Sequence, residues 1–141
     1  MKRRSLLLAL VLPTAASATE YSEGDVWTFK ARANEPKAKV AIAHIERNTP
    51  EGDIYFVYFL DVRLQLKGPP GPALAYGSVA VKKEALDASV LQRVATGAKY
   101  PYQSGYTMWK ESLEKYKVGA YRKSLTELLE HLERTVFLTK W

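Results

Sequence analysis

Two histidines are the only imidazole groups in the chain, and they limit the acid–base and metal chemistry that it can support. His44 falls in the middle of an expected strand, and His131 falls on an expected helix, four residues after Glu127. A histidine pair could hold a metal ion or exchange protons, but no His-x-x-x-His or similar ligand spacing is present. We interpret one as a partly buried strand residue and the other as a surface residue, and we expect no metal and no cofactor.

Two acids form the other possible reactive pair. Asp61 lies on the outer face of a long expected strand, and Glu46 lies near the end of the strand before it. Carboxylates about 5–10 Å apart can cleave a glycosidic bond. The favoured interpretation is two surface acids balanced by Arg47 and Arg63. The alternative function is a small cell-envelope hydrolase acting on sugars or peptidoglycan, with Asp61, Glu46 or His44 as acid–base groups.

The sequence lacks the residues that several other kinds of chemistry require. The chain has no cysteine, so thiolate nucleophiles, thiolate metal sites and disulfides are excluded. It has no Gly-x-Ser-x-Gly motif, and its one Gly-Ser pair, Gly77-Ser78, falls in an expected strand. Gly68 and Gly71 are surrounded by prolines, which lack the N–H donors of a phosphate-binding loop. We therefore expect no catalytic residues and a protein that is not an enzyme.

The aromatic residues are the most suggestive feature, with nine tyrosines, three tryptophans and four phenylalanines. Tyrosine and tryptophan combine an apolar body with a polar edge, which suits stacking on sugars and contacts with proteins. One group spans an expected loop and the helix after it, where the last two members also suit packing on the sheet. Another group lies on the long strand. The candidate ligand- or partner-binding residues are Tyr100, Tyr102, Tyr106, Trp109, Tyr55 and Phe59.

Residues 1–18 have the pattern of a secretory signal peptide. A short basic start precedes the apolar run Leu6–Leu12, and Ala16-Ser17-Ala18 is a small-residue cleavage signal. The apolar run is too short to span a bilayer. We expect cleavage after Ala18 and a periplasmic or secreted protein without a stable membrane anchor. The general secretory route is favoured over the twin-arginine route.

Residues 19–141 have a length typical of one domain. The formal charge is +6, but three basic residues lie in the leader, which leaves 18 Lys and Arg against 15 Asp and Glu. The two signs are interleaved, whereas nucleic-acid binding usually needs a concentrated basic stripe. We expect no nucleic-acid partner.

The periodicity predicts four strands followed by helices. Alternation of apolar residues predicts strands over residues 25–32, 37–47, 54–66 and 73–81, with a rigid loop at 67–72. In the third strand we expect the even positions from Ile54 to Leu66 to form one core face, with Tyr55, Val57 and Phe59 making the first half apolar on both faces. Such a strand needs cover on both sides.

Three helices are expected after the strands. Leu86, Val90 and Val94 recur at every fourth position and predict a helix over residues 82–97. A second helix begins near Tyr106 and stops before Gly119, and a third begins at Ser124 with a capping-box spacing to Glu127. The prediction is an α+β domain with a four-stranded antiparallel sheet followed by two or three C-terminal helices packed on one face.

Three segments carry a resemblance. They are residues 24–32, residues 83–90, and Gly105-Tyr106-x-x-Trp109 followed by Gly119-Ala120-Tyr121. Together they resemble a group of small exported bacterial proteins with no assigned activity. The resemblance covers nearly all of residues 19–141 and implies a compact α+β domain, without implying a substrate.

The leading functional hypothesis is a non-catalytic periplasmic or secreted binding protein. Its expected partner is another exported protein, as for an inhibitor or immunity-type protein, or a cell-wall glycan. A homodimer whose interface covers Tyr55, Val57 and Phe59 is a further possibility.

Overall fold

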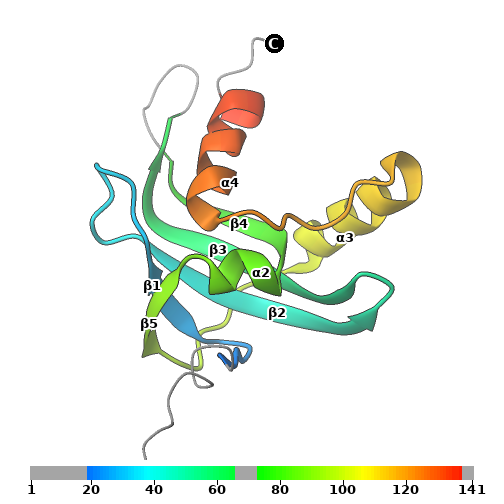
Figure 1. The fold of residues 1–141 in the computed structure, drawn as a ribbon, viewed down its shortest axis with the longest axis horizontal. Helices are drawn as coiled ribbons and strands as arrows, with labels where there is room; N and C mark the ends of the chain where they lie inside the picture. The colour runs from blue at the N-terminus through cyan, green and yellow to red at the C-terminus, as the bar shows by residue number, and fades with distance from the viewer. Residues whose placement is uncertain (1–18, 66–72, 138–141) are drawn as a thin grey trace, which may run out of the picture.

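The computed structural model describes residues 19–65 and 73–137. The expected leader (1–18) and the expected rigid loop (67–72) therefore lie outside the described residues. The described chain has an α+β fold, with a five-stranded antiparallel sheet and three short α-helices (Figure 1). The two later helices each continue into a π-helical turn, at Ser112–Tyr116 and at Glu133–Phe137.

The sheet has the strand order β4-β3-β2-β1-β5, and each neighbouring pair is antiparallel. Its strands are β1 (Val26–Phe29), β2 (Lys39–Thr49), β3 (Gly52–Leu64), β4 (Ala73–Lys82) and β5 (Val90–Ala95). The four predicted strands are confirmed. The fifth is a correction, because it lies within the segment predicted to be a helix.

The segment 82–97 divides into a one-turn helix and a strand. Helix α2 (Lys83–Asp87) buries Leu86 and then ends. Val90 and the residues after it pair with the free edge of β1, so β1 has partners on both sides. Valine is β-branched and favours extended backbone, so the spacing of Leu86, Val90 and Val94 does not mark one helical face.

Two register irregularities reverse the facing of side chains within the central strands. In β2 the register shifts between Ile42 and His44, so His44 turns away from the face that carries Ile42. In β3 a second shift includes Asp61, whose φ of 55° is left-handed. A β-bulge adds one residue and inverts the alternation beyond it. The predicted even-numbered core face of β3 is therefore wrong, and the main core combines Tyr55, Val57, Phe59, Val62 and Leu64.

The helices cover both faces of the sheet. Helix α4 (Leu125–Leu132) packs four leucines over the face that carries Val57 and Phe59, and α2 packs on the same face. Helix α3 (Gln103–Glu111) packs Trp109 on the opposite face, against Ile54 and Phe56. The expectation of helices on one face is thus wrong. Helices lie on both faces of the sheet because the first half of β3 is apolar on both of its faces, and each face must be covered.

Side-chain hydrogen bonds fix where α4 begins. The predicted capping box is confirmed: the Glu127 N–H donates to Ser124 Oγ, and the Ser124 N–H donates to the Glu127 carboxylate. The buried hydroxyl of Ser89 donates to the Ala85 carbonyl and accepts from the Leu125 N–H at 2.8 Å. These bonds join α2 to the first turn of α4.

Candidate functional site: an aromatic surface around His44

The irregularity in β2 places His44 on the α3 side of the sheet. There it lies opposite Phe56 in the β2–β3 register, with ring centroids 6.0 Å apart. Tyr102, which directly precedes α3, stacks on the imidazole with a centroid distance of 3.9 Å and an interplanar angle of 14°. The histidine side chain is 19% exposed, so one edge of the stack reaches solvent.

Both ring nitrogens of His44 are engaged by carboxylates. Nδ1 lies 2.9 Å from Glu23 Oε2, and Nε2 lies 2.8 Å from Glu46 Oε1. Each ring nitrogen of His44 therefore faces a carboxylate of the protein itself. Among residues 19–65 and 73–137 no group of three or more His, Asp or Glu side chains could hold a metal ion.

The loop before α3 is fixed to the sheet at several points. Tyr100 stacks on Tyr58 of β3, with centroids 4.9 Å apart and an interplanar angle of 28°. The Tyr58 hydroxyl donates to the Pro101 carbonyl at 2.6 Å. The Ala98 N–H donates to the Gly24 carbonyl at 3.0 Å. Tyr100 and Tyr102 are therefore held half-exposed on a loop that has little freedom to move.

A cavity of about 270 Å³ lies between this loop and the start of the described chain. Gly24 makes the close approach possible, because its φ is 91° and a Cβ there would lie 3.0 Å from the Ala98 carbonyl oxygen. The wall combines two tyrosines, a carboxylate, an amine and backbone groups. Its residues are Glu23, Gly24, Ala43, Gly97, Ala98, Lys99, Tyr100 and Tyr102. We call this cavity the tyrosine pocket.

The other predicted aromatic residues of this group have packing roles. Trp109 is 7% exposed, and its Nε1–H donates to Glu51 Oε1 at 2.8 Å, which fixes α3 to the β2–β3 turn. Tyr106 lies between Phe56 and Trp109, at centroid distances of 5.9 and 5.7 Å, and remains half-buried. Tyr100 and Tyr102 line the tyrosine pocket, whereas Tyr106 and Trp109 do not.

Tyr55 and Phe59 lie on the other face of the sheet, which α2 and α4 cover. They are 3% and 0% exposed, and their rings pack edge-to-face on Tyr21 and Phe29. Burial raises the pKa of the Tyr55 hydroxyl above its ordinary value. This placement corrects the expectation for both residues, because neither offers surface to a ligand or to a second copy of the chain. Val57, at 0% exposed, is equally enclosed.

The predicted acids do not form a pair. Asp61 is 57% exposed and forms an ion pair with Lys39, near the start of β2, whereas Glu46 lies beside His44 toward the other end. Residues 39 and 46 are seven apart on one strand, which corresponds to roughly 20 Å at about 3.3 Å per residue. That separation is too large for the two carboxylates to flank one glycosidic bond.

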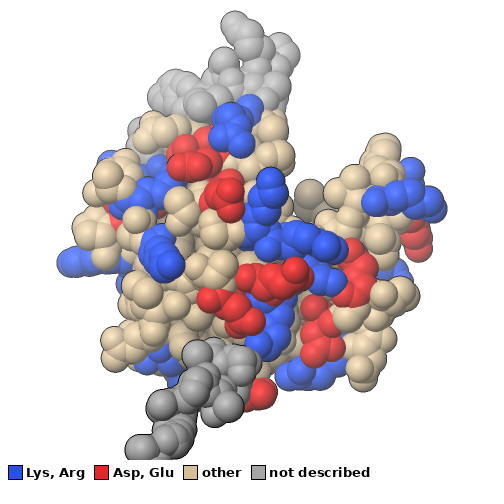
Figure 2. Space-filling view, in the orientation of Figure 1, with Lys and Arg blue, Asp and Glu red and all other residues tan. Residues whose placement is uncertain are grey.

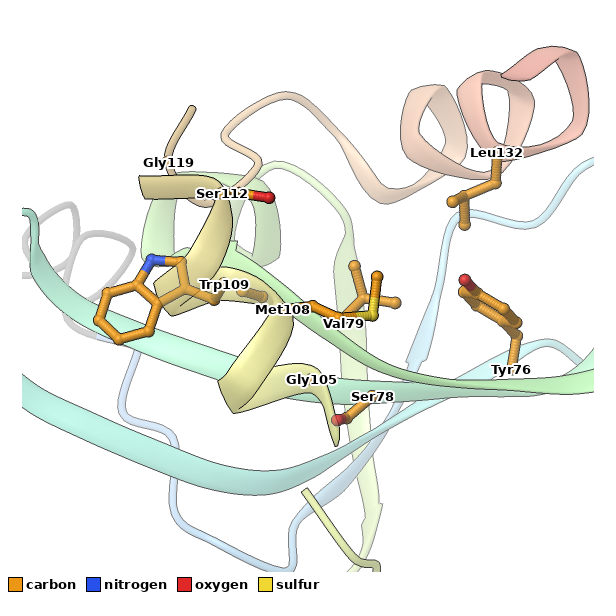
Figure 3. A pocket seen from close by; sticks show the side chains of 10 residues that line it. Tyr76, Ser78, Val79, Gly105, Met108, Trp109, Ser112, Gly119 and Leu132 are labelled. Atoms are coloured by element: carbon orange, nitrogen blue, oxygen red, sulfur yellow. The ribbon is translucent and has the colours of Figure 1, made fainter. Parts of the chain in front are cut away.

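A cleft that the sequence did not suggest lies at the outer edge of β4, about 210 Å³ in volume (Figure 3). Two of its lining residues, Tyr76 and Val79, pack against the core on the face of the sheet that α4 covers. Two others, Ser78 and Ala80, lie on the face that α3 covers. Because a cavity that touches both faces of a strand must lie at its edge, we call it the edge cleft.

Gly105 carries the one sequence signal for the edge cleft. A Cβ at this position would lie 2.1 Å from Ser78 Oγ, so only glycine lets α3 cross β4 this closely. A glycine in the first turns of a helix is otherwise unfavourable. The contact partner, however, is set by the tertiary fold and cannot be read from the spacing.

No protein-family model, curated protein or solved structure matches this chain. In the described residues, no helix has the length and apolar character needed to cross a bilayer.

Proposed function

We propose that this chain is a non-catalytic binding protein of the bacterial periplasm or the secreted fraction. It holds another exported protein or a cell-wall glycan at the tyrosine pocket without transforming it. The observation that carries the proposal is the engagement of His44: its two nitrogens are held by Glu23 and Glu46, while Tyr100 and Tyr102 beside it stay half-exposed.

The physical support is preorganisation. A ligand that orders a loose loop loses affinity, because the ordering entropy opposes binding. Here Tyr100 is already stacked on Tyr58, and Tyr102 on His44, so the exposed tyrosine surface is fixed before a ligand arrives. Tyrosine also contributes a large contact area with few rotatable bonds. Lys99 and Glu23 add one charge of each sign to the rim.

The compartment is part of the proposal. The leader pattern in residues 1–18 fits a protein that works outside the cytoplasm. Because the chain has no cysteine, its stability depends on its core. Mass spectrometry of material collected from the periplasm should give a chain that begins at Thr19. A chain that still begins at Met1 in that fraction would contradict cleavage.

Titration calorimetry with two kinds of probe tests binding at the tyrosine pocket. The probes are soluble peptidoglycan fragments and exported proteins purified from the same periplasm. Tyr100→Ala should weaken binding of the true ligand about tenfold or more, because a stacked aromatic contact is lost. Tyr116→Ala removes a tyrosine that is 72% exposed elsewhere and should leave binding unchanged. Equal effects of the two substitutions would refute the site.

The alternative function, a small envelope hydrolase, retains one motivating contact. Glu46 and His44 lie together at 2.8 Å, as an acid–base pair would. Peptidoglycan fragments incubated with the protein should be recovered intact by mass spectrometry under our proposal. Cleavage that disappears in Glu46→Gln would instead establish the hydrolase.

A further inference from the structure

Strand β4 is an edge strand whose outer side is only partly covered. It pairs with β3 along its length, and on its outer side it makes one parallel bridge, between Val81 and Tyr121. There the Tyr121 N–H donates to the Ala80 carbonyl at 3.0 Å, and the Lys82 N–H donates to the Tyr121 carbonyl at 2.7 Å. The chain's own backbone therefore already adds to this edge.

Upstream of that bridge, the same edge forms the floor of the edge cleft. Figure 3 shows Met108 of α3 extending over Val79, and Leu132 of α4 pointing toward Tyr76. Met108 is 64% exposed, so an apolar wall stands open to solvent beside the strand. An edge strand beside a cleft is an arrangement that can bind an extended peptide as an added strand.

A basic hollow adjoins the edge cleft, and Gly119 lines both. The hollow has a volume of about 570 Å³, and Lys117, Arg122, Lys123, His131 and Arg134 line it. Figure 2 shows several Lys and Arg side chains on this face between α4 and α3, with Asp and Glu side chains beside them. Its composition predicts a preference for negatively charged groups.

Two of the basic side chains in the hollow have no acidic partner among the described residues. Arg122 and Lys123 form no ion pair with any residue in 19–65 or 73–137, whereas Lys83 pairs with Asp87. Glu51 is the one acid that lines the hollow, and its Oε1 already accepts hydrogen bonds from Trp109 Nε1 and the Ala120 N–H.

We propose that the edge cleft and the basic hollow together bind an extended acidic segment of a partner protein. The segment adds to β4 as a further strand, places one apolar side chain between Met108 and Leu132, and sets its carboxylates against Arg122 and Lys123. Charge complementarity selects an acidic peptide over a neutral one. The inference rests on the proposed binding function but uses a separate surface, since the edge cleft and the tyrosine pocket share no lining residue.

The probe for this site is a fluorescent nine-residue peptide of alternating valine and threonine, with a central leucine and three glutamates at its C-terminal end. Fluorescence anisotropy should detect binding that weakens as salt rises. Three control probes separate the contributions: the same peptide with lysines in place of glutamates, the same peptide with methylated backbone nitrogens, and nonaglutamate. Each control should bind at least about tenfold more weakly. Nonaglutamate binding as tightly as the probe would overturn the proposal in favour of a general polyanion site.

Matched protein variants locate the contact. The double variant Arg122→Glu, Lys123→Glu should weaken peptide binding at least about tenfold. The control is the double variant Lys30→Glu, Lys37→Glu, which changes two exposed lysines that do not line the hollow. It should change peptide binding less than about twofold.

Met108→Glu should also weaken binding about tenfold, because it places a charge in the apolar part of the cleft. Leu91→Glu, at a leucine that is 62% exposed on β5, is its control. Amide hydrogen exchange at residues 76–79 should slow when the peptide is bound. No binding, or binding without that slowing, would overturn the proposal. Neither result would affect the Tyr100→Ala test, so the two proposals fail independently.

Discussion

Glu35 is an acid held almost entirely inside the protein, and its replacement by glutamine gives the sharpest stability prediction. The residue lies in the connection between β1 and β2 and is 1% exposed. Its carboxylate accepts hydrogen bonds from Arg32 Nε at 2.9 Å, from Arg32 Nη2 at 2.6 Å and from the Arg63 N–H at 2.6 Å. Arg32 also pairs with Glu133, at 2.9 Å, so the network ties the β1–β2 connection to the end of α4.

The expected cost of Glu35→Gln follows from those contacts. Glutamine keeps the shape of the side chain, but its NH₂ group can only donate and must face one of the groups that donate to the Glu35 carboxylate. One hydrogen bond is therefore lost, and the remaining acceptor oxygen no longer carries a negative charge. A hydrogen bond to a charged group contributes about 1.5–3 kcal/mol, and breaking a buried ion pair costs about 3–5 kcal/mol. Because Glu133 still neutralises Arg32, we expect the free energy of unfolding to fall by about 2–4 kcal/mol at pH 7.

The pH dependence has a defined sign. Burial alone would raise the pKa of Glu35, but the hydrogen bond from Arg32, the Arg63 N–H and the Arg32 charge outweigh it and hold the pKa below its ordinary value of 4.5. The stabilisation is therefore complete above about pH 5, and it is lost as the pH falls through the lowered folded-state pKa. The difference between wild type and Glu35→Gln should narrow over the same acid range.

Urea unfolding at pH 7, 5.5 and 4 measures both effects. Asp61→Asn is the matched control, because Asp61 and its partner Lys39 are 57% and 29% exposed, and an exposed pair contributes about 0–1 kcal/mol. Asparagine also tolerates the left-handed backbone at this position. A loss below about 0.5 kcal/mol for Glu35→Gln at pH 7, or a difference that grows in acid, would refute the reasoning.

Three further substitutions test the placement of the helices. Gly105→Ala should destabilise the fold by about 1–3 kcal/mol, because the new Cβ overlaps Ser78 Oγ; differential scanning calorimetry that finds no loss would contradict the close crossing of α3 over β4. Ser124→Ala should cost about 1 kcal/mol in urea unfolding through the loss of the cap on α4, and an unchanged midpoint would argue against the capping box. Trp109→Phe should cost about 1–3 kcal/mol because Glu51 loses its indole donor, and a smaller cost measured by urea unfolding would show that this bond is dispensable.

Local patterns were sufficient to predict the first four strands and the start of α4. Alternation of apolar residues predicts the half-buried strands β1 to β4, and the Ser124–Glu127 spacing predicts a helix cap. Both features form between residues that are close in sequence, so the sequence alone reveals them. The two-sided apolar character of Tyr55, Val57 and Phe59, with Ile54 and Phe56 between them, also predicted cover on both faces of β3.

The errors arose where tertiary contacts override local signals. Strand β5 forms because β1 offers a free edge to Val90 and its neighbours, a fact that residues 82–97 do not contain. Simple alternation would place His44 on the same face as Ile42, but the irregularity between them turns it to the other face, so its contacts with Glu23 and Tyr102 were not foreseen.

The candidate site was anticipated in part. Tyr100 and Tyr102 stood out because they flank a proline in an expected loop, and both are half-buried residues that line the tyrosine pocket. Tyr55 and Phe59 were expected on a surface because they appeared to lie on the back of the strand; the core instead forms on their side. The edge cleft joins β4, α3 and α4, which are distant in sequence, so no spacing could reveal it.

Site-specific photo-crosslinking in an exporting host tests the central claim most directly. A benzophenone side chain is introduced at Tyr100, with the exposed Tyr116 as the control position, and adducts are analysed by mass spectrometry. The account predicts one discrete adduct from position 100, containing an intact protein or glycan, and none from position 116. Identical adducts from both positions, no adduct from position 100, or an adduct that carries a cleaved partner would contradict a binding protein that acts through the tyrosine pocket.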